Sequence, residues 1–242
     1  MAGNLTVSQL ATLRDALKEQ QRRQEEGGHL KKWFLDEGPY RYETYPKHLA
    51  FFKNGEAHRE RLFMAANRVG KSLAGAYEIT CHVTGLYPHW WEGKRFDEPT
   101  DCWAAGDTGQ TTRDILQNTL LGFPSGNLGS GMIPGSLISN VRRRSGIADA
   151  IDTVRVKHIS GGDSILGFKS YDQGRRSFQG TGKDVIWLDE ECPQDVYGES
   201  IIRTMTTDGI VYVTFTPLLG MTKFIQDFLH DAHKEAEQHS YV

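Results

Sequence analysis

One short stretch of the chain carries the pattern of a phosphate-binding loop. The run Ala65-Ala66-Asn67-Arg68-Val69-Gly70-Lys71-Ser72 matches that pattern, except that Ala65 replaces the first glycine. In such a loop, backbone N–H groups and the N-terminus of the following helix bind phosphate oxygens. Lys71 would lie between the β- and γ-phosphates of a nucleotide, and the Ser72 hydroxyl would bind Mg²⁺. The residues expected to contact the nucleotide here are Ala66, Asn67, Arg68, Val69, Gly70, Lys71, Ser72 and Leu73.

A second group of residues has the pattern of an acidic strand end, as in a Walker B motif. Four apolar residues, 185–188, precede Asp189, Glu190 and Glu191. The Asp189 carboxylate would hold Mg²⁺, directly or through water, and the next acid would orient and deprotonate an attacking water. Neighbouring side chains of an extended chain point to opposite faces, so Glu190 and Glu191 cannot both do this. We assign the catalytic base to Glu190, with Glu191 as the alternative.

A third signal is the sequence Thr214-Phe215-Thr216-Pro217 at the end of an apolar run. A hydroxyl such as that of Thr216, at the tip of a strand beside the phosphate loop, could sense the γ-phosphate. The alternative is that threonine stands here for its β-propensity alone. The second glycine-lysine pair, Gly182-Lys183, lacks a following Ser or Thr and precedes a strand, so we interpret it as a loop.

The elements that must position these residues alternate between short apolar runs and helical stretches. Continuous apolar strands that alternate with helices are typical of an α/β fold, in which a mostly parallel sheet is flanked by helices. The expected strands are 62–65, 102–105, 185–188 and 210–213, with two more around 154–156 and 165–168 that form a hairpin. The expected helices are 72–84, 108–121 and 222–236.

The organisation of the chain changes near residue 61. Residues 5–26 have the periodicity of an amphipathic helix, and the chain up to residue 60 is aromatic-rich. We therefore expect a small helical, lid-like N-terminal region over 1–60, and a nucleotide-binding core over 61–242. The stretch 123–135 is rich in Gly, Pro and Ser and is expected to be a surface loop.

Composition limits the classes of function. The 28 Lys and Arg against 31 Asp and Glu give a net charge of −3, which excludes a generally basic, histone-like nucleic-acid binder. Nucleic acid would have to be held by a local basic patch or by an assembled ring. The chain has no run of about 18 apolar residues that would predict a transmembrane helix. Three cysteines without a CxxC pair fit a reducing compartment.

These motifs, in this order, resemble the ATPase half of tailed-phage terminase large subunits, and most closely the headful-packaging type of short-tailed phages. The resemblance extends from about residue 40 to the C-terminus. The stretches that carry it are 63–72, 82–88, 173–175, 178–180, 187–191 and 214–221.

The resemblance implies a P-loop NTPase of the ASCE or RecA-like class, with ATP and Mg²⁺ as cofactors. It implies ATP hydrolysis that powers the translocation of double-stranded viral DNA into a procapsid. The implied partners are double-stranded DNA, the portal protein, the terminase small subunit and further copies of the chain in a ring. The implied location is the host cytoplasm, with transient docking on the procapsid portal and absence from the mature virion. The family also has a nuclease domain, which we expect to be absent from this chain, so nuclease activity is not expected.

The resemblance also implies roles for single residues. Arg68 occupies the position of the arginine that the family carries in its phosphate loop. Arg175 is our candidate for an arginine that reaches a neighbour's γ-phosphate, with Arg176 and the run 142–144 as alternatives. For that run, a basic patch for DNA phosphates is the other interpretation. Tyr45 and His48 stand where the family reads adenine, with His48 in place of the usual glutamine.

Two other functions remain open at this point. One is a different P-loop DNA-translocating ATPase, of the helicase or recombinase type, against which the stretch 178–221 argues. The other is a nucleotide-binding module with little turnover in isolation, because its catalytic arginine comes from a neighbour.

Overall fold

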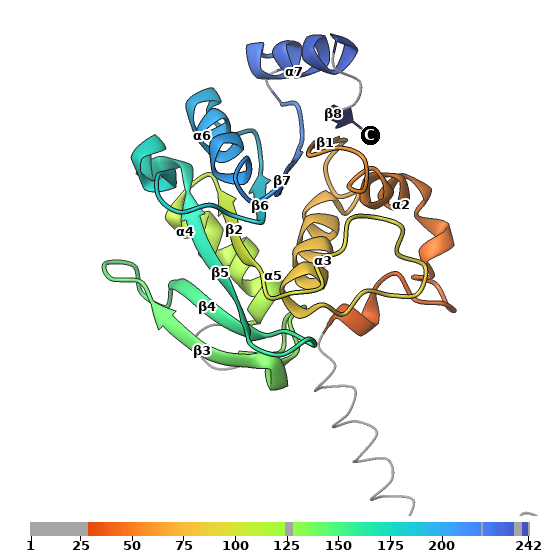
Figure 1. The fold of residues 1–242 in the computed structure, drawn as a ribbon, viewed down its shortest axis with the longest axis vertical. Helices are drawn as coiled ribbons and strands as arrows, with labels where there is room; N and C mark the ends of the chain where they lie inside the picture. The colour runs from red at the N-terminus through yellow and green to blue at the C-terminus, as the bar shows by residue number, and fades with distance from the viewer. Residues whose placement is uncertain (1–28, 124–127, 219, 235–238, 242) are drawn as a thin grey trace, which may run out of the picture.

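The computed structural model describes residues 29–123, 128–218, 220–234 and 239–241. Within these residues one sheet has the strand order β3-β4-β5-β2-β6-β7-β1-β8 (Figure 1). The strands are β1 (Glu60–Met64), β2 (Asp101–Gly106), β3 (Ile138–Arg143), β4 (Ile151–Lys157), β5 (Asp163–Ser170), β6 (Val185–Asp189), β7 (Ile210–Phe215) and β8 (His239–Tyr241).

The strand directions confirm the predicted fold class. From β5 to β8 all neighbours are parallel, whereas β4 is antiparallel to both β3 and β5. The predicted hairpin is therefore present, as β4 and β5. Strand β7 lies between β1, which precedes the phosphate loop, and β6, which ends at Asp189. Strands β3 and β8 were not predicted.

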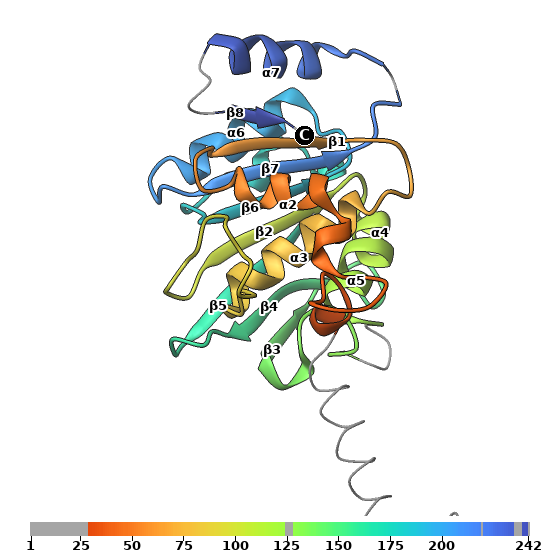
Figure 2. The same ribbon diagram turned by 90° about the vertical axis from the view of Figure 1, so that its right-hand side faces the viewer.

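Helices cover both faces of the sheet (Figures 1 and 2). On one face lie α2 (Pro46–Lys53), α3 (Lys71–Thr84) and the consecutive segments α4 (Gly109–Thr111), η3 (Thr112–Gln117) and α5 (Asn118–Leu121). On the other lie α6 (Gln194–Thr204) and α7 (Lys223–Lys234). The short turns of helix are η1 (His29–Lys32), η2 (Tyr42–Thr44), η4 (Gly135–Leu137), η5 (Tyr171–Gln173) and η6 (Arg175–Phe178). Within the described residues, no helix is both long and apolar enough to cross a membrane.

The predicted helices are present with small differences. The expected helix 108–121 is interrupted, because its middle, η3, is a π-helix. The predicted strand 62–65 ends one residue earlier, since Ala65 already belongs to the phosphate loop. The predicted helix 5–26 lies outside the described residues. The described part of the N-terminal region contributes Phe34, Phe51 and Phe52 to the core that α3 shares.

Gly75 lets α3 approach the sheet closely. A Cβ atom at this position would lie 2.5 Å from the indole of Trp187 on β6. The Tyr212 hydroxyl of β7 also donates to the Gly75 carbonyl, at 2.9 Å. The helix that follows the phosphate loop is thus held directly against the two strands that carry Asp189 and Thr216 at their ends.

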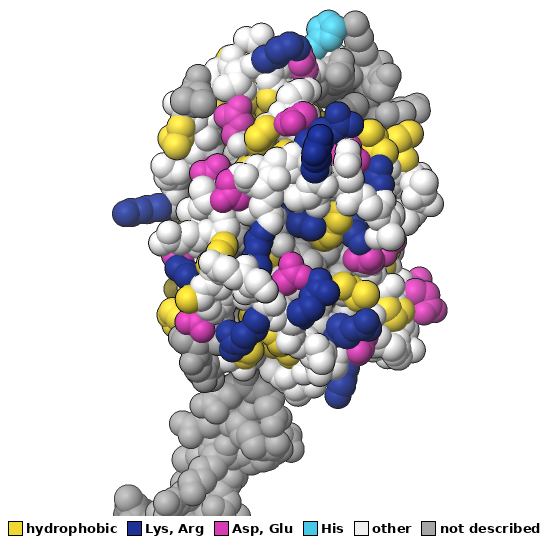
Figure 3. Space-filling view, turned by 90° about the vertical axis from the view of Figure 1, so that its left-hand side faces the viewer, with side chains coloured by type: hydrophobic (Ala, Val, Ile, Leu, Met, Phe, Trp, Pro, Cys, Tyr) yellow, Lys and Arg dark blue, Asp and Glu magenta, His cyan; other side chains and the backbone are white. Residues whose placement is uncertain are grey.

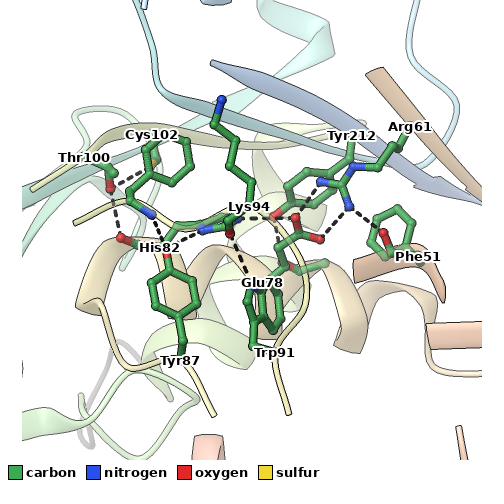
Figure 4. A network of polar contacts seen from close by, with 12 residues as sticks. Phe51, Arg61, Glu78, His82, Tyr87, Trp91, Lys94, Thr100, Cys102 and Tyr212 are labelled. Atoms are coloured by element: carbon green, nitrogen blue, oxygen red, sulfur yellow. Dashed lines mark hydrogen bonds and ion pairs between the residues drawn. The ribbon is translucent and has the colours of Figure 1, made fainter. Parts of the chain in front are cut away.

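A buried ion pair joins the two elements that flank the phosphate loop (Figure 4). Arg61 of β1 lies 2.5 Å from the Glu78 carboxylate of α3, and both side chains are 1% exposed. Arg61 also donates to the Phe51 carbonyl at 2.7 Å, and His82 Nε2 lies 3.3 Å from Glu78. Burial raises the pKa of Glu78, but the charge of Arg61 and the contact with His82 outweigh it, so the pKa is lowered. The pair therefore stays charged and ties β1 to α3.

Candidate functional site

The predicted phosphate loop connects β1 to α3, as its pattern requires. Helix α3 begins at Lys71, and its N-cap, Gly70, has φ = 88° and gives no side-chain cap. Arg68 has φ = 62°, in the left-handed region that few residues other than glycine adopt. A helix N-terminus without a side-chain cap leaves N–H groups of its first turn available to an anion. The local geometry suits a phosphate.

Lys71 connects the loop to the end of β7. Its Nζ donates to the Ala66 carbonyl and to the Thr216 hydroxyl, both at 2.8 Å. The Thr216 hydroxyl in turn donates to the Asn67 side chain at 2.7 Å. Burial lowers the pKa of Lys71, while the negative charges of Glu190 and Asp189 act in the opposite direction. The structure thus brings together the three signals that lie apart in the sequence.

Asp189 lies at the end of β6 and is buried. It accepts a hydrogen bond of 2.6 Å from the Thr214 hydroxyl. Burial raises its pKa to about 6, against the effect of hydrogen bonds from Thr214 and Ser72. The hydroxyl of Ser72 and the carboxylate of Asp189 are therefore adjacent, and both are hard oxygen ligands that suit Mg²⁺.

Ser72 and Asp189 fit a magnesium ion whose other ligands do not come from the protein. The described residues contain no cluster of three or more His, Cys, Asp or Glu that could hold a metal. Mg²⁺ at a phosphate loop takes its remaining ligands from nucleotide phosphates and water.

The two candidate bases have different surroundings. Glu190 is exposed, and its charge acts on Lys71. Its backbone is in the left-handed region, with φ = 70°, and its N–H donates to the Thr214 carbonyl at 2.8 Å. Glu191 accepts a hydrogen bond from the Thr222 hydroxyl, just before α7. This geometry favours Glu190 as the residue that faces the phosphate loop.

A pocket of about 520 Å³ adjoins the phosphate loop. Tyr45 and His48, predicted to read the base, both line it. Burial lowers the pKa of His48, and hydrogen bonding of its ring to the backbone of Gly70 and Val69 partly offsets this. Mostly apolar walls beside a phosphate site are suited to a planar base. The pocket is lined by Thr44, Tyr45, Pro46, Lys47, His48, Phe63, Met64, Ala65 and Val69.

Arg175, the candidate for an arginine that reaches a neighbour's γ-phosphate, forms an ion pair with α6 and not with the phosphate loop. Arg175 of η6 has its Nε 3.0 Å from Glu199 of α6, and its side chain is 53% exposed. Glu199 also pairs with Arg203 at 3.0 Å. The alternative run 142–144 lies at the end of β3, where Arg142 pairs with Asp152. Gly182-Lys183 is a loop as predicted, and Lys183 contacts Asp101 at 2.5 Å.

Two supporting contacts of Asp189 were missed in the sequence, one from Trp187 through Thr214 and one from Tyr171. Trp187 Nε1 donates to the Thr214 hydroxyl at 2.7 Å, and that hydroxyl donates to Asp189. Tyr171 also donates to the Asp189 carbonyl at 2.9 Å. A polar residue within the apolar run of β7 was the available signal for Thr214. The contact of Tyr171 depends on the fold and had no local signal.

Comparisons with known proteins identify the family to which this chain is similar. Residues 62–241 match the family described as "Terminase large subunit, T4likevirus-type, N-terminal". The terminase large subunit of Salmonella phage P22 is 36% identical over 214 residues, which cover 81% of this chain and 43% of that protein. The chain therefore spans less than half the length of this curated relative.

Solved structures of large terminases share the fold. One from a thermophilic bacteriophage has a TM-score of 0.50 at 10% identity, over 82% of this chain and 45% of that one. The same terminase in complex with ADP has a TM-score of 0.50 at 14% identity, over 82% and 44%. The large terminase of bacteriophage HK97 has a TM-score of 0.52 at 14% identity, over 80% and 36%. With the matched family and the P22 relative, the conclusion is that this chain belongs to the terminase large subunit family.

Proposed function

We propose that this chain hydrolyses ATP in a Mg²⁺-dependent reaction that powers the translocation of double-stranded DNA into a viral procapsid. The observation that carries the proposal is the contact of Lys71 with Thr216, beside the adjacent pair Ser72 and Asp189. The structurally similar terminase of the thermophilic bacteriophage, in its complex with ADP, supports a nucleotide as the ligand.

The phosphates, the base and the magnesium ion each have a counterpart among these residues. The loop 66–73 binds the phosphates, and the pocket with Tyr45 and His48 takes the base. Ser72 and Asp189 are the residues that would hold Mg²⁺. When bound, this ion neutralises charge on the β- and γ-phosphates.

The chemical step is a displacement at the γ-phosphorus. Glu190 accepts a proton from a water molecule as the water oxygen forms its bond to phosphorus. The bond from phosphorus to the bridging oxygen breaks, and that oxygen leaves with ADP. Lys71 and Arg68 stabilise the negative charge that develops on the transferring phosphoryl group, and Thr216 senses its presence.

The biological setting follows from the family and is proposed with the reaction. Copies of the chain assemble in a ring, on the portal of the procapsid in the host cytoplasm, with double-stranded DNA and the terminase small subunit as partners. In that ring Arg175 acts on the nucleotide of a neighbour. No nuclease chemistry is proposed for this chain.

The test is ATP turnover at several protein concentrations, with Mg²⁺ or with EDTA. We expect turnover that requires Mg²⁺, rises with protein concentration, and disappears in Glu190→Gln while ATP binding is retained. Glu191→Gln is the matched control and should keep its turnover. Turnover in Glu190→Gln and not in Glu191→Gln would reverse the assignment of the base.

The same experiment separates the second candidate function. ATP binding without turnover in the unmodified chain, at every concentration, would identify a nucleotide-binding module and would contradict the proposed hydrolysis.

A further inference from the structure

Glu190, the proposed catalytic base, has an unusual backbone conformation. Its φ of 70° lies in the left-handed region, which is unfavourable for a residue that carries a Cβ atom. A residue other than glycine keeps such a conformation only where surrounding contacts hold it there. Strand β6 ends at Asp189, so Glu190 is the first residue beyond it. The contacts of the peptide group between Asp189 and Glu190 therefore determine where the Glu190 side chain points.

Both polar groups of that peptide are hydrogen-bonded. The Glu190 N–H donates to the Thr214 carbonyl of β7 at 2.8 Å. The Asp189 carbonyl accepts a hydrogen bond of 2.9 Å from the hydroxyl of Tyr171, the first residue of η5. Because the two bonds hold opposite sides of the peptide group, they fix its orientation and, with it, the φ of Glu190.

The Tyr171 side chain is itself held in place. It is 6% exposed, and it belongs to the apolar cluster to which α6 and α7 contribute. Burial raises the pKa of Tyr171 well above its usual value, so the hydroxyl keeps its proton and remains a donor. The carbonyls of Ala105 and Glu190 are also within its reach, both at 3.4 Å. The contact with the Asp189 carbonyl is the shortest of the three, so this is the carbonyl that the hydroxyl holds.

Tyr171 also begins a segment that reaches the surface. Residues 171–178 follow β5 and lie beside α6, at the left of Figure 1. Arg175 and Arg176 in this segment are exposed. Figure 3 views the molecule from that side and shows Lys and Arg side chains among acidic ones. A change at Tyr171 could therefore act inward, on Glu190 of the same subunit, or outward, through Arg175 on a neighbour's nucleotide.

We propose that Tyr171 is a positioning residue, whose hydroxyl holds the peptide between Asp189 and Glu190 so that the Glu190 carboxylate faces the phosphate loop. This role deepens the proposed function and rests on it. Without the hydroxyl, the peptide can rotate and Glu190 can return to a negative φ, which turns its side chain away from the nucleotide. Tyr171 acts on the activation of water through Glu190, and ATP binding does not depend on it.

The test compares Tyr171→Phe with a matched control, Tyr212→Phe. Both tyrosines are buried, and each donates to a backbone carbonyl at 2.9 Å, but the carbonyl that Tyr212 contacts is that of Gly75 in α3. The kcat and KM for ATP are measured for both variants and the unmodified chain. Urea unfolding confirms that each protein is folded.

We expect Tyr171→Phe to lower kcat by at least about 10-fold, because a displaced base activates water poorly, and to leave KM within about twofold. The control should keep both values within about threefold. An equal loss of kcat in the control would contradict the proposal, since the loss of any buried hydroxyl would then explain it. A higher KM with an unchanged kcat would also contradict it.

A second variant restores the donor without the hydroxyl. Replacement of Tyr171 by 4-aminophenylalanine places an N–H donor at the same end of the ring, so most of the kcat should be retained. This variant also tests the proposal if Tyr171→Phe does not fold. A kcat that is at least 10-fold lower than that of the unmodified chain would show that a donor at this position is not sufficient, and would overturn the proposal.

Mixing of subunits separates the inward route from the outward one. Lys71→Ala should not bind ATP, but it keeps both Arg175 and Tyr171. If Tyr171 acts on Glu190 of its own subunit, addition of Lys71→Ala protein will not restore the turnover of Tyr171→Phe. Restored turnover would show that Tyr171 acts through Arg175 and would contradict the assigned role.

A crystal structure of Tyr171→Phe gives a result that does not depend on turnover. We expect Glu190 to have a negative φ in this variant. A φ that remains near 70° would overturn the proposal, because other contacts would then hold the conformation. Failure of ATP turnover in the unmodified chain would instead contradict the proposed hydrolysis, and the φ of Glu190 would still show whether Tyr171 holds the peptide.

Discussion

Two polar clusters lie along α3, one at its start and one in its middle, and they differ in how far they are exposed to solvent. At the start of the helix, Lys71 contacts Thr216 and the loop at a partly exposed edge. In the middle of the helix, Glu78 pairs with Arg61 and contacts His82, with all three side chains at most 1% exposed. The first cluster is open to a ligand, and the second is closed by protein atoms on all sides.

The difference in exposure determines what each cluster can do. A group at the exposed edge can gain or lose a ligand without leaving a buried charge unpaired. In the closed cluster, loss of one partner leaves the other charge in a medium of low polarity, at a cost of several kcal/mol. Substitutions at the edge should therefore reduce ATP binding and turnover strongly and the free energy of unfolding only slightly. Substitutions in the closed cluster should have the opposite effect.

The largest effect is expected for Lys71→Ala. It removes the ammonium group between the phosphates, so ATP binding should weaken by at least about 100-fold, which equals about 2.7 kcal/mol, and turnover should become undetectable. The free energy of unfolding should change by no more than about 1 kcal/mol. Isothermal titration with ATP and urea unfolding measure the two quantities, with Lys53→Ala as the control. A large loss of stability would remove the distinction between the two clusters.

Arg175→Ala should reduce turnover by roughly 10³-fold and leave ATP binding unchanged, because a trans arginine stabilises only the transition state. Glu199 keeps its partner Arg203, so folding should be retained. A mixture of Arg175→Ala and Lys71→Ala proteins provides the decisive measurement. Each supplies what the other lacks, so turnover should return in part. No recovery, together with weak ATP binding by Arg175→Ala, would indicate a role within one subunit.

Glu78→Gln should lower the free energy of unfolding by about 3–5 kcal/mol, because Arg61 would remain buried without a counter-charge. In the folded fraction, the KM for ATP should stay within about twofold. Urea unfolding and steady-state kinetics at low temperature test the two statements. Arg61→Met/Glu78→Met, which removes both charges, should recover most of the stability. A double variant as unstable as Glu78→Gln would show that packing, not charge, explains the loss.

The smallest effect concerns pH. Burial lowers the pKa of His82 below its usual value of 6.5, although its contacts with Glu78 oppose this. The unfolded chain therefore binds a proton more readily, and stability should fall as the pH decreases below about 6.5 toward the lowered pKa. The slope from this one group is at most about 1.4 kcal/mol per pH unit.

His82→Gln should remove that share of the pH dependence. Burial lowers the pKa of His48 and His158 as well, so a residual slope is expected. Urea unfolding of both proteins at pH 7.5, 6.5 and 5.5 measures the difference. Parallel stability curves for the two proteins would mean that the pKa of His82 is the same in the folded and the unfolded protein.

The exposed edge could be predicted from the sequence because its signals are local. Each of its three signals occupies a few consecutive residues: the loop 65–72, the acidic end of β6, and Thr214 with Thr216 at and just after the end of β7. The apolar runs before them predicted the strands. The sequence assigned Glu190 and left Glu191 as the alternative. The contact of Glu191 with Thr222, which favours Glu190, joins two loop residues 31 positions apart and had no local signal.

The closed cluster could not be predicted, because Arg61 and Glu78 are 17 positions apart and meet only when α3 packs on β1. Each charge alone has the pattern of an exposed residue. Strand β3 was missed for a related reason. Its sequence, ISNVRR, shows no regular alternation of buried and exposed residues, and it lies at the edge of the sheet.

The hydrogen bonds from Trp187 through Thr214 to Asp189 also have an optical consequence. Trp187 is buried, and its indole N–H is two hydrogen bonds from the carboxylate that is proposed to bind magnesium. The protein has four other tryptophans, at positions 33, 90, 91 and 103. With these four replaced by phenylalanine, the fluorescence of Trp187 would report on the charge and ligands of Asp189, without an added label.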